Sequence, residues 1–381
     1  MKKAIIALAL CCALAGNACA EGLVYTATGR DESAIEVTGT DEVTISGALI
    51  QKTAGDASSA DASSFRGVNA AVRVADHATL TLTDSVIEAG ASNATGVFAY
   101  DGGTVYISDS TVTVTGGGAG GVQVAGGGTL IGSNLTVTSA SKAAIRSDRG
   151  GGVMVLDGGS YTSTGKNGCP AIYSTADITV RNAVCASAQS RAVIIEGKNT
   201  VTLENVTIEG NDQSTRDDSV HANVLLYQSA SGDAGVGTSV FTMTGGAITA
   251  HSGAMFYCTN TASVINLTGA ELNLSDDGTL LIVGAGRWGR DGRNGGQCVL
   301  NAEDQTLEGA VTVDAISSLA LNLVGSSFQG SVSGEGEVRV SMDGNSAWTL
   351  TGDSRITSLD GDITRIDANG YHLYVNGEQV L

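Results

Sequence analysis

The chain has 381 residues, of which 53 are glycine, one is proline and 4% are aromatic. It carries 39 acidic and 20 basic side chains, a formal net charge of −19 that disfavours binding to nucleic acid or to anionic membrane surfaces. Short runs rich in β-branched residues, separated by glycine-containing corners, predict an all-β protein. The acidic balance itself fits a plain solvated surface, which we favour, or binding of cations or of a basic partner.

The first twenty residues have the pattern of an export signal. A short basic start precedes the apolar run Ala4–Leu14, and residues 18–20 (Ala-Cys-Ala) match an A-x-A cleavage site. We therefore expect a signal peptide over 1–20 and a mature chain that is secreted or held at the cell surface. Acylation of Cys19, as in a lipoprotein, is the alternative. No later segment predicts a transmembrane helix.

A repeat of about two dozen residues follows. Each repeat has an apolar anchor, a residue two positions earlier that is apolar in all but Thr129, and a turn former two positions later, except at Ala302. An apolar residue five positions after the anchor indicates a second strand, and runs such as Ala192-Val193-Ile194-Ile195 indicate a third. The anchors are Ile45, Leu82, Ile107, Ile131, Leu156, Val180, Leu203, Met243, Leu267, Leu300, Leu323 and Met342.

A fixed period of this size predicts a solenoid whose repeats stabilise one another by stacking. We expect about twelve three-strand rungs over 43–345, stacked at about 4.8 Å with the apolar columns pointing inward. An open rung exposes unpaired backbone groups, so both ends need a cap. We assign an N-terminal cap to 21–42 and terminal rungs with a C-terminal cap to 346–381.

Three longer anchor spacings indicate insertions, which in solenoids form loops that often lie on a functional face. The first, over 54–64, consists of small residues and predicts a flexible loop with little chemistry. The second divides into 211–221 and 229–238, and the third is 284–297. Loops 229–238 and 284–297 leave the same corner two rungs apart, so we expect them to touch.

The candidate ligand-binding residues lie in the second and third insertions. Arginine binds carboxylates in a bidentate manner, and aromatic rings stack on sugar or peptide faces. We therefore expect a contact with an acidic glycan or with a protein of a host or bacterial surface. The competing interpretation, to which the sequence gives more weight, is a loop that ties itself down through Arg–Asp pairs. The candidates are Arg287, Trp288, Arg290, Asp291, Arg293, Asp217, Asp218 and His221.

The corner columns of Asp, Asn and Gly, such as Asp84–Asp109 and Asn182–Asn205, resemble those of the right-handed parallel β-helix of the pectin-lyase-like superfamily. The stretches 286–296 (GRWGRDGRNGG), 305–309 (QTLEG) and 316–319 (ISSL) are similar to secreted, adhesin-like and passenger-like β-helix proteins of gut-type bacteria. The resemblance implies the fold and an exported role. It implies no single activity, because this fold hosts lyases, hydrolases and adhesins alike.

Catalysis finds weak support in the sequence. Asp217 and Asp218 with His221 are the best constellation, but a solvated turn is the favoured interpretation, and the companion residues that the hydrolase and lyase families would imply are missing. No metal-ligand spacing or cofactor motif occurs, so we expect neither group. The sequence favours a binding protein over an enzyme. A polysaccharide lyase or glycoside hydrolase is one alternative, and a purely structural envelope protein is another.

The cysteines are predicted to be structural. Cys185 and Cys298 fall in inward columns and act as small apolar groups. Cys169 and Cys258 fall near corners of rungs far apart, so a bond between them is not expected. Export would permit disulfides, but the register does not demand one.

Overall fold

The computed structural model describes residues 22–215 and 220–381. The predicted signal peptide, with Cys19, and the candidates Asp217 and Asp218 lie outside these residues. The chain divides into two compact units, Met1–Gly165 with Ala176–Ile178, and Lys166–Thr175 with Thr179–Leu381. Strand β16 (Asp177–Arg181) is shared between them. Each unit is a parallel β-helix, as the repeat predicts.

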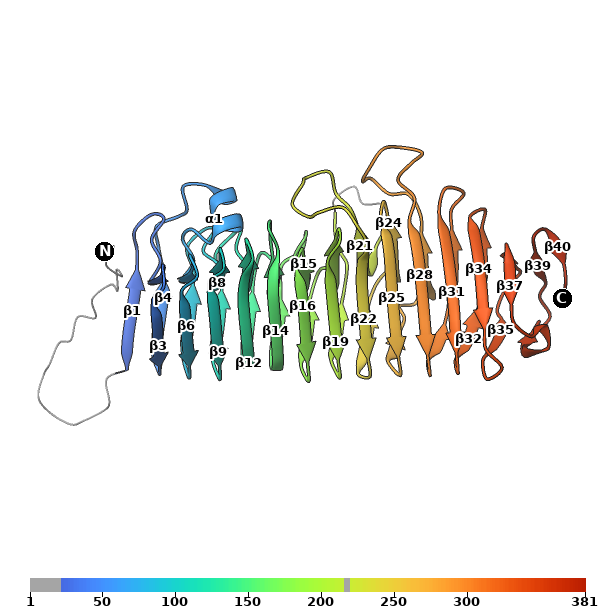
Figure 1. Ribbon diagram of the computed structural model, residues 1–381, viewed down its shortest axis with the longest axis horizontal. Coiled ribbons are helices and arrows are strands. Elements are labelled where there is room, and N and C mark those ends of the chain that lie inside the picture. Colours follow the sequence, from blue (N-terminus) through green and yellow to red (C-terminus); the bar gives the residue numbers. More distant parts are fainter. Residues whose placement is uncertain (1–21, 216–219) are drawn as a thin grey trace, which may run out of the picture. The chain divides into compact units, whose positions relative to one another are not determined.

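In unit 1 the chain passes through a first, a second and a third strand and then repeats, so that strands one turn apart pair in parallel (Figure 1). The first and second strands belong to one sheet and the third strands to another. The first and second are β1 (Leu23–Ala27), β3 (Glu42–Ser46), β4 (Ala48–Lys52), β6 (Thr79–Thr83), β7 (Val86–Ala89), β9 (Thr104–Ser108), β10 (Thr111–Val114), β12 (Gly128–Ser139) and β14 (Gly152–Ser163). The third are β2 (Ile35–Val37), β5 (Val72–Val74), β8 (Val97–Tyr100), β11 (Val122–Ala125) and β13 (Ile145–Ser147).

Unit 2 has the same order of strands, but its last four second strands form a separate sheet of four strands. Its first strands are β19 (Thr200–Glu204), β22 (Ser239–Thr244), β25 (Ala262–Thr268), β28 (Gln297–Glu303), β31 (Ser318–Val324), β34 (Glu337–Met342) and β37 (Ser358–Asp360). Its second strands are β17 (Val184–Ser187), β20 (Thr207–Gly210), β23 (Ala247–Ala250), β26 (Glu271–Asn273), β29 (Thr306–Glu308), β32 (Ser327–Gly330), β35 (Ala347–Leu350) and β38 (Ile366–Asp367). Its third strands are β15 (Ile172–Ser174), β18 (Val193–Glu196), β21 (Ala222–Tyr227), β24 (Ala254–Thr259), β27 (Thr279–Val283), β30 (Ala310–Val313) and β33 (Val332–Gly334).

The C-terminal end of unit 2 adds a small sheet of β36 (Ser354–Ile356), β39 (Leu373–Val375) and β40 (Glu378–Gln379) and the short helix η1 (Ile363–Arg365). Strand β39 pairs with β40 in the antiparallel direction. Beside it, Trp348 is fully buried, stacks on Phe328 at 5.5 Å and donates its indole N–H to Gly330 O at 3.0 Å. The second of the chain's two tryptophans, Trp348, therefore fills the core near the final turns.

The predicted inward columns are present. Ile45 pairs with Leu82 and Val43 with Leu80, and the second-strand residue Ile50 pairs with Ile87 in the next turn. Period-two alternation places these side chains inside, where Leu80, Leu82, Ile50 and Ile87 have no exposed surface. Stacking of like apolar side chains therefore provides the core along each column.

The turn former after the first strand adopts the left-handed conformation in turn after turn. Its φ is 52° at Asp84, 50° at Asp109 and 49° at Asn182. Asn and Asp tolerate this region better than other side-chain-bearing residues, which explains their recurrence at this corner. The neighbouring amides also join, because Asn205 Nδ2 donates to Asn182 Oδ1 at 3.0 Å.

Two predicted anchors were wrong. Ile107 pairs with Gly132, and Val105 with Leu130, so Ile131 points outward and is 38% exposed. A Cβ at Gly132 would lie 2.8 Å from Leu156 Cδ2, so the neighbouring leucine occupies the space of the missing side chain. Leu130 therefore takes the inward position assigned to Thr129, and the column has no polar exception there.

The second wrong anchor is Leu300. The register pairs Leu267 with Ala302, so Ala302 is the anchor itself and Asp304, with a φ of 46°, is the corner. Ala302 is 1% exposed, as an inward residue should be. The apparent break in the turn-former column arises because Leu300 lies two residues before the true anchor, Ala302. Inward residues alternate along the whole of β28, so both positions fit the pattern.

The first insertion is not the predicted flexible loop. It contains the helix α1 (Ala60–Arg66), which begins where Ser59 Oγ accepts a hydrogen bond from the Ala62 N–H at 3.2 Å and ends at Gly67 with a φ of 67°. The helix joins the third-strand sheet of unit 1, because Gln123 Nε2 donates to Ser64 O at 2.8 Å. The alanine and serine residues of 54–64 fit a flexible loop by composition, but Ser59 and Gly67 are residues that begin and end a helix.

Across residues 22–215 and 220–381, no helix has the length and apolar character needed to cross a membrane.

Candidate functional site

The candidate site lies on the outer face of the third-strand sheet of unit 2. In a β-helix this face normally meets water, but all six residues of β21 and all six of β24 are buried. Phe256 points inward, where its ring lies 5.8 Å from that of Phe241, so the adjacent Tyr257 points outward. A strand buried on both faces is rich in apolar residues, and these two strands are apolar at every position except Asn223 and Thr259.

The second and third insertions cover this face (Figure 1). The outward column runs through Tyr173, Ile194, Leu225, Tyr257 and Ile282, which pair in register from strand to strand. With Ala222, Ala254 and Tyr227 it forms an apolar cluster against which Trp288 packs. The tryptophan of the third insertion therefore anchors that loop to the sheet rather than standing free in solvent.

Hydrogen bonds between side chains and backbone groups hold the third insertion in place. Tyr257 Oη donates to Ala285 O at 3.0 Å, and the Ala285 N–H donates to Asp314 Oδ2 at 2.6 Å. Asn294 Nδ2 closes the loop on Gly286 O at 2.6 Å. Among the described residues, Arg290 and Arg293 form no ion pair, so the loop keeps its shape without their guanidinium groups. This differs from the predicted self-tying through Arg–Asp pairs at these two positions.

Asn260 links the third insertion to the end of the strand that precedes loop 229–238. The Asn260 N–H donates to Asn294 O at 3.1 Å, and Asn260 Nδ2 donates to Gln228 O at 2.7 Å. Asn260 follows β24 and has a φ of 52°. It therefore joins the end of the third insertion to Gln228, the residue before loop 229–238.

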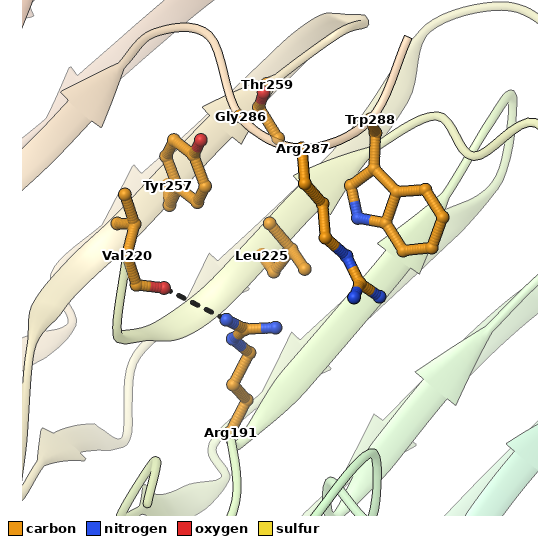
Figure 2. Close-up of a pocket in the computed structure, with 8 residues that line it drawn as sticks. All are labelled: Arg191, Val220, Leu225, Tyr257, Thr259, Gly286, Arg287 and Trp288. Atoms are coloured by element: carbon orange, nitrogen blue, oxygen red, sulfur yellow. Dashed lines mark hydrogen bonds between the residues drawn. The ribbon is translucent and has the colours of Figure 1, made fainter. Parts of the chain in front are cut away.

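A narrow depression, whose enclosed space of about 10 Å³ holds roughly one water molecule, lies between the third insertion and strands β21 and β24 (Figure 2). Arg287 lies at its rim, with the guanidinium carbon 4.1 Å from the centre of the Trp288 ring. The ring of Trp288 in turn lies 5.4 Å from that of Tyr227. The lining is completed by Arg191, Val220, Leu225, Tyr257, Thr259 and Gly286.

The stacking prepares Arg287 for binding. A guanidinium held on an indole face keeps its N–H groups directed outward in its own plane, so less freedom is lost when a carboxylate binds. Because Arg287 and Tyr227 both contact Trp288, the indole serves chiefly as a platform for the arginine. The exposed group that would meet a ligand is therefore the Arg287 guanidinium.

The buried carboxylate of Glu196 holds Tyr227, which packs against Trp288. Glu196 is 1% exposed, and its Oε2 accepts hydrogen bonds from Tyr173 Oη at 2.5 Å and from Tyr227 Oη at 2.9 Å. Its Oε1 accepts hydrogen bonds from Ser229 Oγ and, at 3.4 Å, from Ser231 Oγ. Glu196 thus fixes Tyr227 and also ties the second insertion to the sheet.

A buried ion pair forms the base of the depression. Arg191 Nε lies 3.0 Å from Asp212 Oδ2, and both side chains are almost fully buried. Arg191 Nη2 also donates to Val220 O at 3.0 Å (Figure 2). His221 stands beside this pair, with its Nδ1 at 3.6 Å from Asp212 Oδ2 and nearly half of its side chain exposed.

The structure brings together some of the predicted site residues. Arg287 and Trp288 line the depression, and His221 lies next to its base. Arg290, Asp291 and Arg293 are exposed farther along the same loop and do not line it.

Sequence reasoning missed Arg191, Glu196, Asp212, Tyr227 and Tyr257. The available signal was the predominance of apolar residues in strands β21 and β24, which marks an outer face that something covers.

No group of three or more His, Cys, Asp or Glu side chains with metal-binding geometry occurs in the part of the chain that the structure describes.

No protein-family model matches the chain, and no curated protein shows significant similarity to it.

Proposed function

We propose that this chain is an exported, adhesin-like β-helix protein that binds an acidic glycan through the Arg287–Trp288 corner of its third insertion. The observation that carries the proposal is the Arg287 guanidinium, exposed and stacked 4.1 Å from the Trp288 ring at the rim of the depression. An acidic sugar offers the group that matches it, a carboxylate for the guanidinium.

The charge of the protein supports this use of arginine. A net charge of −19 disfavours general attraction of anions, so an acidic glycan needs a local cationic contact. Arg290 and Arg293, which form no ion pair within the described residues, extend the cationic surface along the loop beyond Arg287. Membership of the pectin-lyase-like superfamily and export to a bacterial surface are parts of the same proposal, supported by the fold and by the N-terminal sequence.

The test is binding of the purified protein to an array of acidic and neutral glycans, with and without calcium. We expect signals on uronate-containing glycans that are lost in the triple variant Arg287→Ala, Arg290→Ala, Arg293→Ala and retained in the matched control Arg365→Ala. Unchanged glycan signals in the triple variant, together with a lowered melting temperature, would instead show that these arginines only stabilise the loop. A blank array would favour a protein partner or a purely structural envelope role.

A polysaccharide-active enzyme is the second candidate, favoured by one observation. His221 lies beside the buried carboxylate of Asp212 at the edge of the depression, an arrangement that can orient an imidazole as a general base. Incubation with each glycan bound on the array would then release shorter fragments, and His221→Ala would abolish the release without abolishing binding. Bound glycans that stay intact would exclude this candidate.

A further inference from the structure

Two cysteines meet in the core of unit 2. Cys258 is on β24 and Cys298 is on β28, 40 positions later, and their sulfur atoms lie 3.6 Å apart. Cys258 belongs to the inward column with Leu226 and Val283, and Cys298 belongs to that with Ser263 and Leu319. The two columns converge at the corner where the third insertion enters β28.

The backbone around this corner keeps the two strands close. A Cβ at Gly296 would lie 2.5 Å from Cys258 O, so only glycine permits this approach. The Gly284 N–H also donates to Cys258 O at 3.1 Å. Backbone contacts at both ends of the third insertion, at Gly284 and Gly296, therefore hold Cys258 close to Cys298.

We propose that Cys258 and Cys298 form a disulfide that closes the base of the third insertion. The sulfur atoms must approach by only about 1.5 Å to reach bonding distance, a shift that rotation of the two side chains can supply. For its oxidant in the cell the proposal rests on the export part of the proposed function, because disulfides persist outside the reducing cytosol. It does not depend on glycan binding.

The reaction is a two-step exchange with a small disulfide such as oxidised glutathione. The thiolate of one cysteine attacks the small disulfide, which forms a mixed disulfide and releases one glutathione thiolate. The second cysteine thiolate then attacks the protein sulfur of the mixed disulfide, which forms the Cys258–Cys298 bond and releases the second glutathione thiolate. Two electrons pass from the protein to the oxidant, and the two thiol protons end on the released glutathione.

The bond should form while the corner is still open. The hydrogen bond with Cys258 and burial both raise the pKa of the Cys298 thiol, so the closed corner contains very little thiolate. Cys185 is a natural comparison, because burial raises its pKa to about 12 and no second cysteine of the described chain accompanies it. We therefore expect Cys185 to remain a thiol under the same conditions.

The experiment refolds the full-length chain from a reduced, denatured state in a mixture of oxidised and reduced glutathione. Free thiols are then alkylated, and the protein is digested with trypsin, which cuts after Arg287, Arg290 and Arg293 and so separates the two cysteines. We expect a linked peptide pair containing Cys258 and Cys298, and an alkylated Cys185. Alkylated Cys258 and Cys298, or a bond from either to a different cysteine, would overturn the proposal.

A stability measurement tests the role of the bond. Reductant should lower the melting temperature of the oxidised wild type by roughly 5–10 °C, because the bond closes a long loop in the unfolded chain. Cys185→Ala should show the same loss, whereas Cys258→Ala should show none. Equal melting temperatures of wild type with and without reductant would contradict the stabilising role. Glycan binding is measured separately, so either proposal can fail alone.

Discussion

Single residues decide how the outer face of the third-strand sheet is organised. Glu196 is a buried carboxylate whose partners are hydroxyl groups rather than a cation, with Tyr173, Tyr227 and Ser229 around it. Hydrogen bonds to a charged acceptor contribute more than those between neutral groups. Glu196 acts as a positioning residue, because it touches the support of Trp288 and not the mouth of the depression.

Glu196→Ala should destabilise the protein and weaken ligand binding together. Removing the carboxylate leaves buried hydroxyl groups without their acceptor, which costs about 1–3 kcal/mol. Loss of the Tyr227 support should also release Trp288 and Arg287. The matched control is Glu204→Ala, because Glu204 is in a half-exposed ion pair with Arg181 that contributes at most about 1 kcal/mol. Chemical denaturation checks the free energy of unfolding, and equal losses in the two variants would contradict the assigned role.

Asp343 should make part of the stability depend on pH. Hydrogen bonds from Ser346 Oγ at 2.6 Å and from the Gly325 N–H at 3.0 Å hold the pKa of this carboxyl below its usual value. A lowered pKa in the folded state adds stability that is fully present above the ordinary pKa and is lost as the pH falls through the lowered one.

The melting temperature of wild type should therefore exceed that of Asp343→Asn at neutral pH, and the difference should begin to shrink as the pH falls below about 4 and vanish once the pH is below the lowered pKa. Asp360→Asn is the control, since the Asp360 side chain accepts no hydrogen bond within the described residues. A constant difference between wild type and Asp343→Asn down to pH of about 2.5 would contradict the account.

At the scale of elements, the corner after each first strand sets the register of the solenoid. Asn205 has a φ of 53°, a region that costs little for Asn and Gly and more for β-branched residues. The corner also fixes the stacking of successive turns through the Asn205–Asn182 amide contact.

Asn205→Val should lower the free energy of unfolding by roughly 1–2 kcal/mol, whereas Asn205→Gly, which keeps the backbone conformation, should lose only the amide contact and cost less. Thr207→Val is the control, because Thr207 lies in the adjacent strand β20 where valine is well tolerated. Urea denaturation measures all three. Equal effects of the valine and glycine variants at position 205 would count against backbone conformation as the cause.

The sequence predicted the elements well where apolar alternation was unambiguous. It misplaced an anchor at Ile131, because Gly132 leaves the true anchor position without a side chain and a neighbouring apolar residue imitates it. It missed α1, because alanine and serine fit a loop as readily as a helix until the capping residues are weighed. It did not predict the contact of Cys258 with Cys298, because that contact joins two different columns at an insertion of irregular length.

At the scale of the whole molecule, an acidic chain with few basic side chains has three arginines on its third insertion, and one of them, Arg287, stacks on Trp288. The sequence pointed to Arg287 and Trp288 through a long anchor spacing and through the residue types within that insertion. It could not reveal Arg191, Asp212 or Glu196, because their roles depend on which turns of the solenoid stack and on what covers the outer face. That Arg290 and Arg293 form no ion pair within the described residues is likewise visible only in three dimensions.

The most direct test of the central claim is a calorimetric titration of the full-length protein with a uronic acid polymer and with its neutral counterpart at physiological salt. We predict saturable binding of the acidic polymer alone, weakened about tenfold or more in Arg287→Ala and unchanged in Arg365→Ala, because a charge-assisted hydrogen bond contributes about 1.5–3 kcal/mol. Equal affinity of wild type and Arg287→Ala for the acidic polymer, or no binding at all, would contradict the account.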